Sequence, residues 1–275
     1  RSCLVGSEMC IRDRIIGNPV EHSLSPKIHN YWLKKNNING IYEKKLLNDK
    51  QKLEEIFKEF KNDNLFAMNV TVPFKQAVIP YIEKLSPIAE KTNSVNTVYK
   101  KNNKIFGDNT DVFGFELSLK DLGLEFRGQT ALILGAGGVV PSIIEGLMNL
   151  GVRDIFISNR TQSNIKSIKN NFSFIQEIEW GKLIESDILI NATSVGLSKN
   201  DELNIDFKSI KPKKLFYDVI YNPPETKFLE SAKNLGHNTL NGKSMFLYQA
   251  QKAFQIWHDI VPKIDKNILN FFEND

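Results

Sequence analysis

The sequence predicts an α/β protein with two domains. Its 275 residues exceed the roughly 150 residues expected of one domain. A short apolar run at residues 130–134 leads directly into the glycine turn 135–138, as in the first strand of a nucleotide-binding β-α-β unit. A helical pattern at 139–150 and a strand pattern at 154–158 complete this unit. Strand and helix patterns also alternate from residue 15 to about 115, which indicates a second α/β unit before the glycines.

The N-terminal part contains three informative segments. Pro26 suits the first turn of a helix, which Ser25 could cap. Residues 49–61 repeat apolar side chains at helical spacing among lysines and glutamates, which predicts an amphipathic helix with a solvated outer face. Residues 66–72 read as a strand that ends at Pro73, because proline cannot donate to a central ladder. We therefore expect Lys75 just past the end of a strand.

The glycines at 135–138 are the first candidate binding motif. Between a strand and a helix, their backbone can approach a pyrophosphate, whose charge is favoured at a helix N-terminus. Val140 occupies the place of the third expected glycine, so a purely structural turn is the alternative. Both readings remain open on this motif alone.

The end of the next strand bears on the choice of cofactor. An acidic residue there would accept a hydrogen bond from a ribose 2′-hydroxyl and repel a 2′-phosphate. This chain instead has Asn159-Arg160-Thr161, which offers a guanidinium fork and a hydroxyl, with Lys166 as a further charge. Such groups suit a phosphate, although Arg160 could also be a solvated surface charge.

Two further apolar runs, at 187–191 and 215–219, each continue into polar residues. The carboxyl ends of parallel strands share one edge of a sheet, and ligands bind at that edge. Residues 244–258 then follow the pattern of a packed helix, which Gln249 interrupts. A glutamine among apolar neighbours is either exposed or hydrogen-bonded to a partner.

Composition argues against several classes of protein. The formal net charge is +4, from 36 basic and 32 acidic residues, and lysines are scattered among glutamates. No contiguous basic stripe indicates nucleic-acid binding, and no apolar run reaches the ~20 residues of a membrane span. We expect a cytoplasmic protein that binds anionic small molecules.

The first residues are unusual for the start of such a fold. Cys3 and Cys10 lie in a stretch with neither helical nor strand periodicity, and residues 11–14 bring charges to the start of a strand that continues as Ile15-Ile16-Gly17. We expect residues 1–13 to be non-native, which would leave a truncated first strand. Two cysteines without nearby histidines make a poor zinc site, so no metal is expected.

Several motifs occur in a fixed order along the chain. They are GNPVEHSLSP at 17–26, NVTVPFK at 69–75, VNT at 95–97, NTD at 109–111, GAGG at 135–138, NRT at 159–161, NATSVG at 191–196, and NGKSM at 241–245 with Gln249. Together they resemble the shikimate dehydrogenase family from about residue 15 to 259, and the joint pattern is far more specific than any single motif. The resemblance implies a substrate-binding catalytic domain at 15–114, completed by 241–275, and a Rossmann-like NADP-binding domain at 115–240. The active site would lie between the two domains.

The family resemblance implies reversible, NADPH-dependent reduction of 3-dehydroshikimate to shikimate, an oxidoreductase step in chorismate and aromatic amino acid biosynthesis. The resemblance makes Lys75 and Asp111 the catalytic groups. The Lys75 ammonium, near the reacting oxygen, could stabilise negative charge and deliver a proton. The Asp111 carboxylate would orient Lys75 and accept a hydrogen bond from the substrate. Hydroxyl and amide side chains suit a polyhydroxylated substrate. The implied substrate-binding residues are Ser23, Ser25, Thr71, Asn96, Asp111, Tyr221 and Gln249. The implied NADP(H)-binding residues are Gly135, Ala136, Gly137, Gly138, Val139, Asn159, Arg160, Thr161, Val219, Gly242 and Met245.

Departures from the family pattern leave alternatives open. Val140 and Pro141 replace a small residue and an arginine, and Asn164 stands where a second arginine is common, which could weaken the preference for NADPH. One alternative is a quinate/shikimate dehydrogenase that uses NAD. Another is a catalytically silent NADP(H)-binding sensor, although such a protein would be free to lose Lys75 and Asp111. The expected assembly is a monomer or a homodimer.

Overall fold

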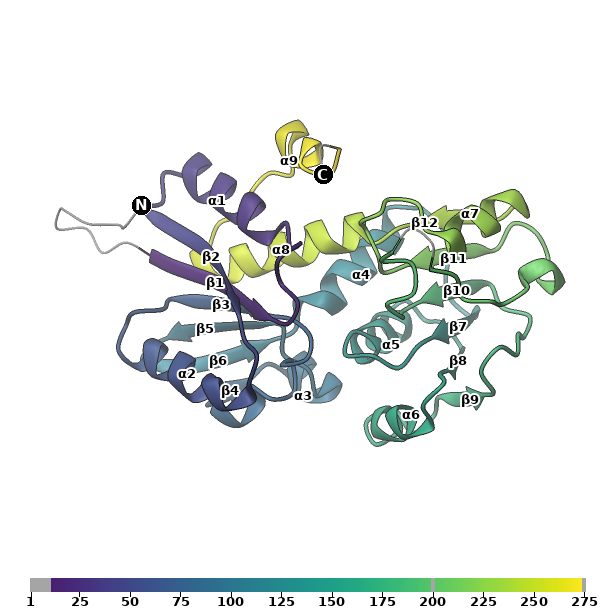
Figure 1. The fold of residues 1–275 in the computed structure, drawn as a ribbon, viewed down its shortest axis with the longest axis horizontal. Coiled ribbons are helices and arrows are strands. Elements are labelled where there is room, and N and C mark those ends of the chain that lie inside the picture. Colours follow the sequence, from purple (N-terminus) through teal and green to yellow (C-terminus); the bar gives the residue numbers. More distant parts are fainter. Residues whose placement is uncertain (1–10, 199–200, 274–275) are drawn as a thin grey trace. The chain divides into compact units, whose positions relative to one another are not determined.

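The computed structural model describes residues 11–198 and 201–273. It divides into two compact units: unit 1 comprises the described residues up to Thr110 and from Ala250 onward, and unit 2 comprises Asp111–Gln249. Each unit contains its own sheet with helices, so the predicted α/β fold class with two domains is confirmed (Figure 1). Both boundaries fall inside helices, α4 (Thr110–Lys120) and α8 (Lys243–His258).

Unit 1 is built on a mixed sheet of six strands in the order β2-β1-β3-β5-β6-β4 (Figure 1). Neighbouring strands β2, β1 and β3 are parallel, whereas β5 is antiparallel to both β3 and β6. The strands are β1 (Ile11–Gly17), β2 (Gly40–Leu46), β3 (Ala67–Val70), β4 (Lys84–Leu85), β5 (Thr97–Lys101) and β6 (Lys104–Asp108). The helical segments are α1 (Ser25–Lys35), η1 (Lys50–Lys52), α2 (Leu53–Lys61), η2 (Ile79–Tyr81), α3 (Pro87–Thr92) and α9 (Lys266–Asn270).

Helix α2 packs on the sheet of unit 1 as its periodicity predicts. Its buried residues are Leu53, Ile56, Phe57 and Phe60. They join the cluster that contains Met68 of β3 and Val98 of β5, while Glu54 and Lys58 form an exposed ion pair on the outer face. Four large apolar side chains buried from one helix stabilise the fold by several kcal/mol, at about 1.5–3 kcal/mol each.

A second cluster joins α1 and β2 to the C-terminal half of α8. Its aromatic members are His29, Trp32, Tyr42, Phe254 and Trp257. The His29 ring stacks on Tyr42 with a centroid distance of 4.3 Å. Burial lowers the pKa of His29 to about 3, so this imidazole is neutral and packs as an aromatic ring.

Replacing Phe254 with alanine is expected to lower the free energy of unfolding by about 3–5 kcal/mol, because its ring is fully buried against Trp32 and His258. Urea denaturation measures the change. Phe174, which is 48% exposed, provides the control, since Phe174→Ala should cost less than about 1 kcal/mol. Equal losses in the two variants would contradict the assignment of the α8 C-terminal half to the core of unit 1.

Strand β1 includes residues 11–13, which belong to the segment expected to be non-native. It begins at Ile11 and runs in register with β2, and from Asp13 also with β3. The main chain supplies these ladder bonds whatever the side chain, which is why the charges at 11–14 do not prevent a strand. Asp13 is buried opposite His258, with 3.2 Å between Oδ2 and Nε2, and burial raises the pKa of Asp13. Residues 1–10, with both cysteines, lie outside the described residues, so the non-native origin of residues 1–13 stays a prediction.

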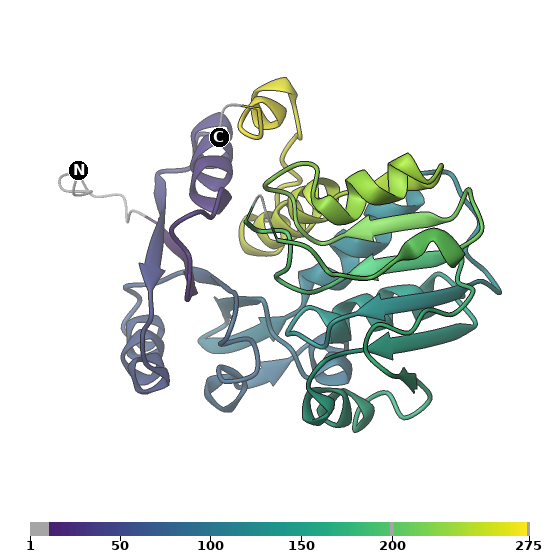
Figure 2. The same cartoon turned by 45° about the vertical axis from the view of Figure 1, so that its right-hand side comes forward.

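Unit 2 contains a sheet of six parallel strands in the order β12-β11-β10-β7-β8-β9 (Figure 2). The strands are β7 (Thr130–Leu134), β8 (Asp154–Ser158), β9 (Gln176–Ile178), β10 (Ile188–Asn191), β11 (Leu215–Asp218) and β12 (Asn238–Leu240). Besides α4 and the N-terminal half of α8, its helical segments are α5 (Val140–Asn149), α6 (Gln162–Lys169), η3 (Phe207–Ser209) and α7 (Lys227–Asn234).

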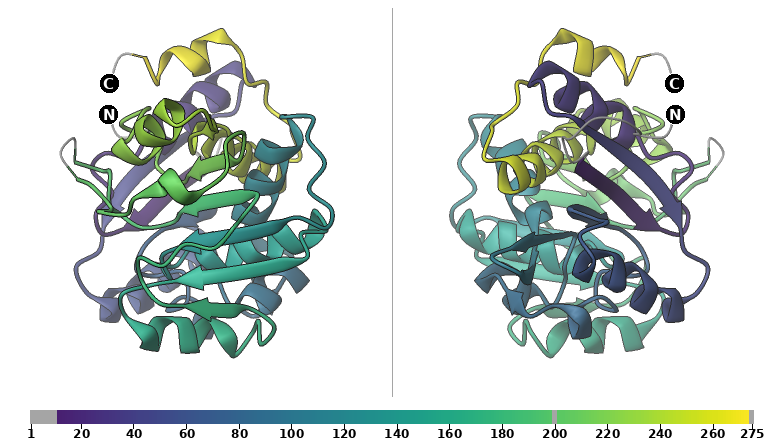
Figure 3. Two further views of the ribbon diagram at one scale, coloured as in Figure 1. Left: turned by 90° about the vertical axis from the view of Figure 1, so that its right-hand side faces the viewer. Right: turned by 90° about the vertical axis from the view of Figure 1, so that its left-hand side faces the viewer.

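Side chains of β7 alternate between two cores, one on each face of this sheet. Ala131 and Ile133 pack with α5 and α6, whereas Leu132 and Leu134 pack with η3 and α7. The left view of Figure 3 shows this sheet with the helices around it. Because both faces are covered, the strand reads as a continuous apolar run in the sequence. The predicted strands at 130–134 and 154–158 are confirmed residue for residue.

Candidate active site

Two loops of unit 1 that carry expected substrate contacts are joined by main-chain hydrogen bonds. The Thr71 N–H donates to Ile16 O at 2.9 Å, and the Asn18 N–H donates to Val72 O at 2.9 Å. Gly17 permits this approach, since a Cβ there would lie 2.2 Å from Thr71 Cγ2. The loop after β1, which continues to the two serines, therefore lies directly beside the loop after β3.

The loop that bears Lys75 is tied to the loop that bears Asn96. The Val95 N–H donates to Lys75 O at 3.0 Å, and the Val70 N–H donates to Asn96 O at 2.8 Å. Lys75 follows β3 at a partly buried position, as the strand and Pro73 predict. Asn96 is 3% exposed, and its side-chain oxygen accepts from the Thr110 N–H at 2.8 Å. The structure thus brings the Thr71, Lys75 and Asn96 segments together within unit 1.

Ser23, and not Ser25, supports the start of helix α1. Helix α1 begins at Ser25, and its N-cap is Leu24, so the prediction that Ser25 caps the helix is wrong. Ser23 Oγ instead accepts from the Ser25 N–H at 3.2 Å, which satisfies one of the helix's unpaired donors from outside. Because Ser23 Oγ acts here as an acceptor, its own proton remains for donation to an anion.

A buried network that the sequence did not reveal lies beneath these loops. The Tyr42 hydroxyl donates to Asn69 Oδ1 at 2.7 Å, and Asn69 Nδ2 donates to Asn96 O at 3.2 Å. Burial raises the pKa of Tyr42, so its hydroxyl stays protonated as the donor. A tyrosine in a strand predicts packing, and only the tertiary structure brings its hydroxyl to Asn69, 27 residues away. Tyr42 and Asn69 hold Asn96 in place.

The remaining expected substrate contacts belong to unit 2. Asp111 lies in the first turn of α4, where the helix dipole favours a negative charge. The Tyr221 ring packs on Phe246 with a centroid distance of 4.5 Å. Gln249 Nε2 donates to Phe246 O at 2.9 Å. The sequence left open whether this glutamine is exposed or hydrogen-bonded, and the structure shows the hydrogen bond. Tyr221 and Gln249 therefore both lie beside Phe246.

The glycine turn of unit 2 fits a dinucleotide pyrophosphate. Gly135 has a φ of +112°, and a Cβ there would lie 2.9 Å from the Ala192 backbone, so this position requires glycine. In contrast, a Cβ at Gly138 would meet nothing within 4 Å, and a Cβ at Gly137 would meet only Ala192 O, at an ordinary contact distance of 3.8 Å. Both glycines are exposed. The backbone is thus open at the start of α5, where N–H groups and the helix dipole favour an anion.

Arg160 and Thr161 lie exposed at the carboxyl end of β8, beside the strand that leads into the glycines. The turn is held by Asn159, whose Nδ2 donates to Thr161 O at 2.8 Å. Lys166 is also exposed, in the last turn of α6. A fixed turn that presents a guanidinium and a hydroxyl to solvent can bind a phosphate monoester. Val219, Gly242 and Met245 lie on other segments of the same unit.

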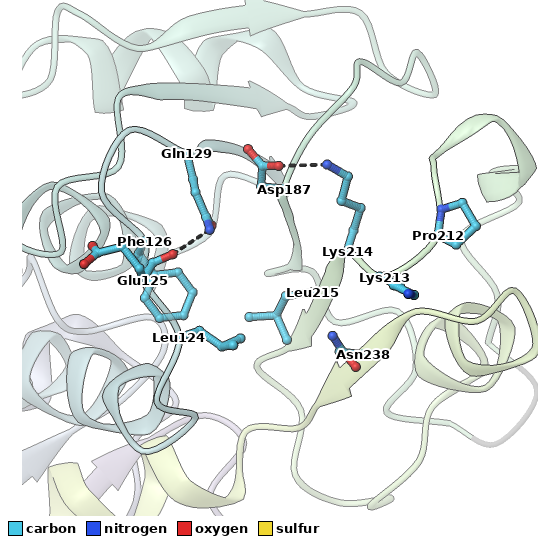
Figure 4. A pocket seen from close by; sticks show the side chains of 10 residues that line it. All are labelled: Leu124, Glu125, Phe126, Gln129, Asp187, Pro212, Lys213, Lys214, Leu215 and Asn238. Carbon is cyan, nitrogen blue, oxygen red and sulfur yellow. Dashed lines mark hydrogen bonds and ion pairs between the residues drawn. The ribbon is translucent and has the colours of Figure 1, made fainter.

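A cavity of about 260 Å³ lies at the opposite, amino edge of this sheet (Figure 4). Its polar lining includes Asp187 and Lys214, which are paired with 2.8 Å between Oδ1 and Nζ. Residues at the amino ends of β7, β10, β11 and β12 surround it, so it is separate from the glycine turn.

Across residues 11–198 and 201–273, no cluster of three His, Cys, Asp or Glu side chains could bind a metal ion. Over the same residues, no helix has both the length and the apolar character to cross a membrane.

Comparison with known proteins identifies relatives over nearly the whole chain. Family models for the shikimate dehydrogenase substrate binding domain and for shikimate / quinate 5-dehydrogenase match residues 15–98 and 116–224. The shikimate dehydrogenase (NADP(+)) of Pelagibacter ubique is 51% identical over 259 residues, which cover 94% of this chain and 97% of the relative.

Two solved structures resemble the fold as a whole. Shikimate 5-dehydrogenase from Listeria monocytogenes, in complex with shikimate and NAD, is 31% identical with a TM-score of 0.86, and the match covers 98% of this chain and 99% of that one. The enzyme from Thermus thermophilus, in complex with NADP(H) and shikimate, is 31% identical with a TM-score of 0.83, covering 92% of this chain and 95% of that one. The chain therefore belongs to the shikimate dehydrogenase family.

Proposed function

We propose that this protein is a shikimate dehydrogenase, which reversibly reduces 3-dehydroshikimate to shikimate with NADPH. The observation that carries the proposal is the joined set of loops in unit 1 that bear Thr71, Lys75 and Asn96, together with an open glycine turn in unit 2. The Pelagibacter relative is named as an NADP-dependent enzyme of this kind, and the Thermus structure contains both ligands. The chain is thus an oxidoreductase of the shikimate pathway that acts on a CH-OH group.

In the proposed substrate site, Ser23 and Ser25 bind the carboxylate, and Tyr221 lies near it. Thr71, Asn96 and Gln249 bind the ring hydroxyls. The Asn96 carboxamide is held by Thr110, because Nδ2 donates to Thr110 Oγ1 at 2.9 Å and Oδ1 accepts from the Thr110 N–H at 2.8 Å. The main-chain carbonyl of Asn96 accepts from Asn69 Nδ2 at 3.2 Å. A fixed amide of this kind discriminates strongly, because a ligand that lacks the matching hydroxyl leaves a buried polar group unpaired.

The proposed chemistry depends on Lys75 and Asp111. NADPH, when bound, supplies a hydride to the carbonyl carbon of the substrate. Negative charge then develops on the carbonyl oxygen, where the Lys75 ammonium stabilises it and donates a proton from Nζ. In the reverse direction, Lys75 Nζ accepts the proton of the shikimate hydroxyl. Asp111 accepts a hydrogen bond from the substrate and so orients the ring.

We propose that Gly135, Ala136, Gly137, Gly138 and Val139 hold the pyrophosphate of NADP(H). Asn159, Arg160 and Thr161 bind the 2′-phosphate, and Val219, Gly242 and Met245 complete the cofactor site. A cytoplasmic location, a monomeric or homodimeric state and the absence of a nucleic-acid partner stay predictions from the sequence.

Replacing Arg160 with alanine is expected to raise KM for NADP⁺ about 10- to 100-fold and to leave KM for NAD⁺ within twofold, because only NADP⁺ carries the 2′-phosphate that the guanidinium binds. Initial-rate kinetics with each cofactor at saturating shikimate measure the change. Arg153→Ala is a control for loss of one positive charge, since Arg153 directly precedes the same strand, at its opposite end, and forms an ion pair with Asp154 at 2.7 Å. An equal rise for both cofactors in Arg160→Ala would rule out the phosphate role.

The function itself is tested by comparing kcat/KM for shikimate and quinate, each with NADP⁺ and with NAD⁺. The proposal predicts the highest value for shikimate with NADP⁺. A highest value for quinate with NAD⁺ would instead identify a quinate/shikimate dehydrogenase.

A further inference from the structure

Asp218, at the end of β11, joins two loops at the carboxyl edge of the unit 2 sheet. Its side chain is fully buried and accepts hydrogen bonds from three directions. Thr226 Oγ1 donates to Oδ2 at 2.6 Å, and the Ile220 N–H donates to Oδ1 at 3.0 Å. Asn191 Nδ2 lies 3.2 Å and 3.1 Å from the two carboxylate oxygens. One carboxylate therefore links the end of β10, the loop after β11 and the start of α7.

The charge state of Asp218 determines how these groups are oriented. Burial raises the pKa of Asp218 to about 6, and the hydrogen bonds from Thr226, Ile220 and Asn191 oppose this rise. At pH 7.5 the group is ionised and can only accept hydrogen bonds. Asn191 must then present its amide N–H groups to the carboxylate, which leaves its carbonyl oxygen for the loop that follows.

That loop, residues 191–195, is organised around the Asn191 side chain. Asn191 Oδ1 accepts from the Thr193 N–H at 3.1 Å and from Thr193 Oγ1 at 2.7 Å. Asn191 Nδ2 also donates to Val195 O at 3.0 Å, and Thr193 Oγ1 accepts from the Val195 N–H at 3.1 Å. The conformation of the loop thus depends on an amide orientation that Asp218 sets.

The two loops fixed by Asp218 lie directly against the proposed cofactor segments. A Cβ on Gly135 would lie 2.9 Å from both the carbonyl carbon and the oxygen of Ala192. A Cβ on Gly242 would lie 2.1 Å from Val219 O. The glycine turn therefore rests on the loop after β10, and the start of α8 rests on the loop after β11. A displacement of either loop would move backbone that the cofactor contacts.

We infer that Asp218 is a positioning residue for the NADP(H) site: it touches no reacting atom, but it fixes the relative position of the loops at 191–195 and 218–221 on which the cofactor segments rest. This inference depends on the proposed function, since it assumes that NADP(H) binds at the glycine turn. A site held rigidly before binding avoids the entropy cost of ordering loops around the ligand.

The test is the dissociation constant for NADPH, measured by fluorescence titration at pH 7.5 without shikimate, for wild type and Asp218→Asn. The variant keeps the size of the side chain but places an NH₂ group where a donor from Thr226 or Ile220 points. We expect Kd to rise at least fivefold, because the loops lose their shared acceptor. A rise of less than fivefold in a folded variant would overturn the inference.

Asp187→Asn is the matched control on the same sheet. Asp187 precedes β10 at the opposite edge, where Oδ2 accepts from the Thr130 N–H at 3.0 Å and Oδ1 pairs with Lys214 (Figure 4). It thus also bridges neighbouring strands, but far from the glycine turn along each strand. We expect its Kd for NADPH to stay within twofold of wild type. A fivefold rise in this control as well would mean that general loss of stability weakens binding, which contradicts a positioning role.

Thr226→Val keeps the inference testable if Asp218→Asn does not fold. This change removes one donor to Asp218 and preserves the shape of the side chain, so we expect Kd to rise at least threefold. A smaller rise would overturn the inference. Failure of the proposed function gives a different result, because wild type would then either not bind NADPH or bind it without reducing 3-dehydroshikimate. Failure of the inference alone leaves both properties of wild type intact.

Discussion

Lys75→Ala is expected to lower kcat for shikimate oxidation by about 10²–10⁴-fold while the dissociation constant for NADPH stays unchanged. The proposed role explains this separation, since the ammonium acts on the substrate oxygen and has no contact assigned with the cofactor. The backbone should not move, because the Lys75 carbonyl, which accepts from the Val95 N–H, is still present in the variant.

Steady-state kinetics and a fluorescence titration with NADPH measure the two quantities for Lys75→Ala. Lys58 supplies the matched control, since it is an exposed lysine of the same unit that forms an exposed ion pair with Glu54, at 3.0 Å. Lys58→Ala should leave kcat within twofold of wild type, because exposed ion pairs contribute little. A kcat for Lys75→Ala within threefold of wild type would remove Lys75 from the chemistry.

Asp111→Asn is expected to lower kcat by about 10²-fold. An amide keeps the shape of the carboxylate but loses the charge, and a hydrogen bond to a charged acceptor is roughly twice as strong as a neutral one. The position of residue 111 should be preserved. The preceding residue, Thr110, is anchored through its N–H to Asn96 Oδ1 at 2.8 Å, and this anchor does not depend on the Asp111 side chain.

The kinetics of Asp121→Asn provide the comparison for Asp111→Asn. Asp121 follows the other end of α4 and contacts the Tyr248 hydroxyl, so its replacement removes one carboxylate near the same helix without touching the proposed site. Its kcat should stay within twofold of wild type. If Asp111→Asn also stays within twofold, Asp111 has no role in turnover.

Strands buried on both faces were the part of the fold most readily predicted. In unit 2, residues 131–134 and 155–157 are continuously apolar because helices cover both faces of a parallel sheet. In unit 1, by contrast, the predicted strand at 66–72 is shorter in the structure, where β3 covers Ala67–Val70. Thr71 instead donates its N–H to Ile16 O and begins the loop that carries the candidate site.

The sequence identified candidate contact residues, but not the residues that hold them. Asn96 was recognised from its motif, whereas the Tyr42 hydroxyl that reaches it through Asn69 depends on strand pairing that no local pattern reveals. Asp218 is a similar case. Its position at the end of an apolar run predicts the carboxyl edge of a sheet, but its link to Asn191 requires β10 and β11 to be neighbours. Local patterns therefore suggest candidate contact residues more readily than the residues that support them.

The most direct measurement of the central claim is the absorbance at 340 nm of NADPH mixed with 3-dehydroshikimate and the folded protein. The proposed function predicts a rapid decrease that requires 3-dehydroshikimate and that slows at least 100-fold in Lys75→Ala. No decrease with a protein that is folded and binds NADPH would contradict the enzyme and would identify a binding protein that has kept the site without the reaction.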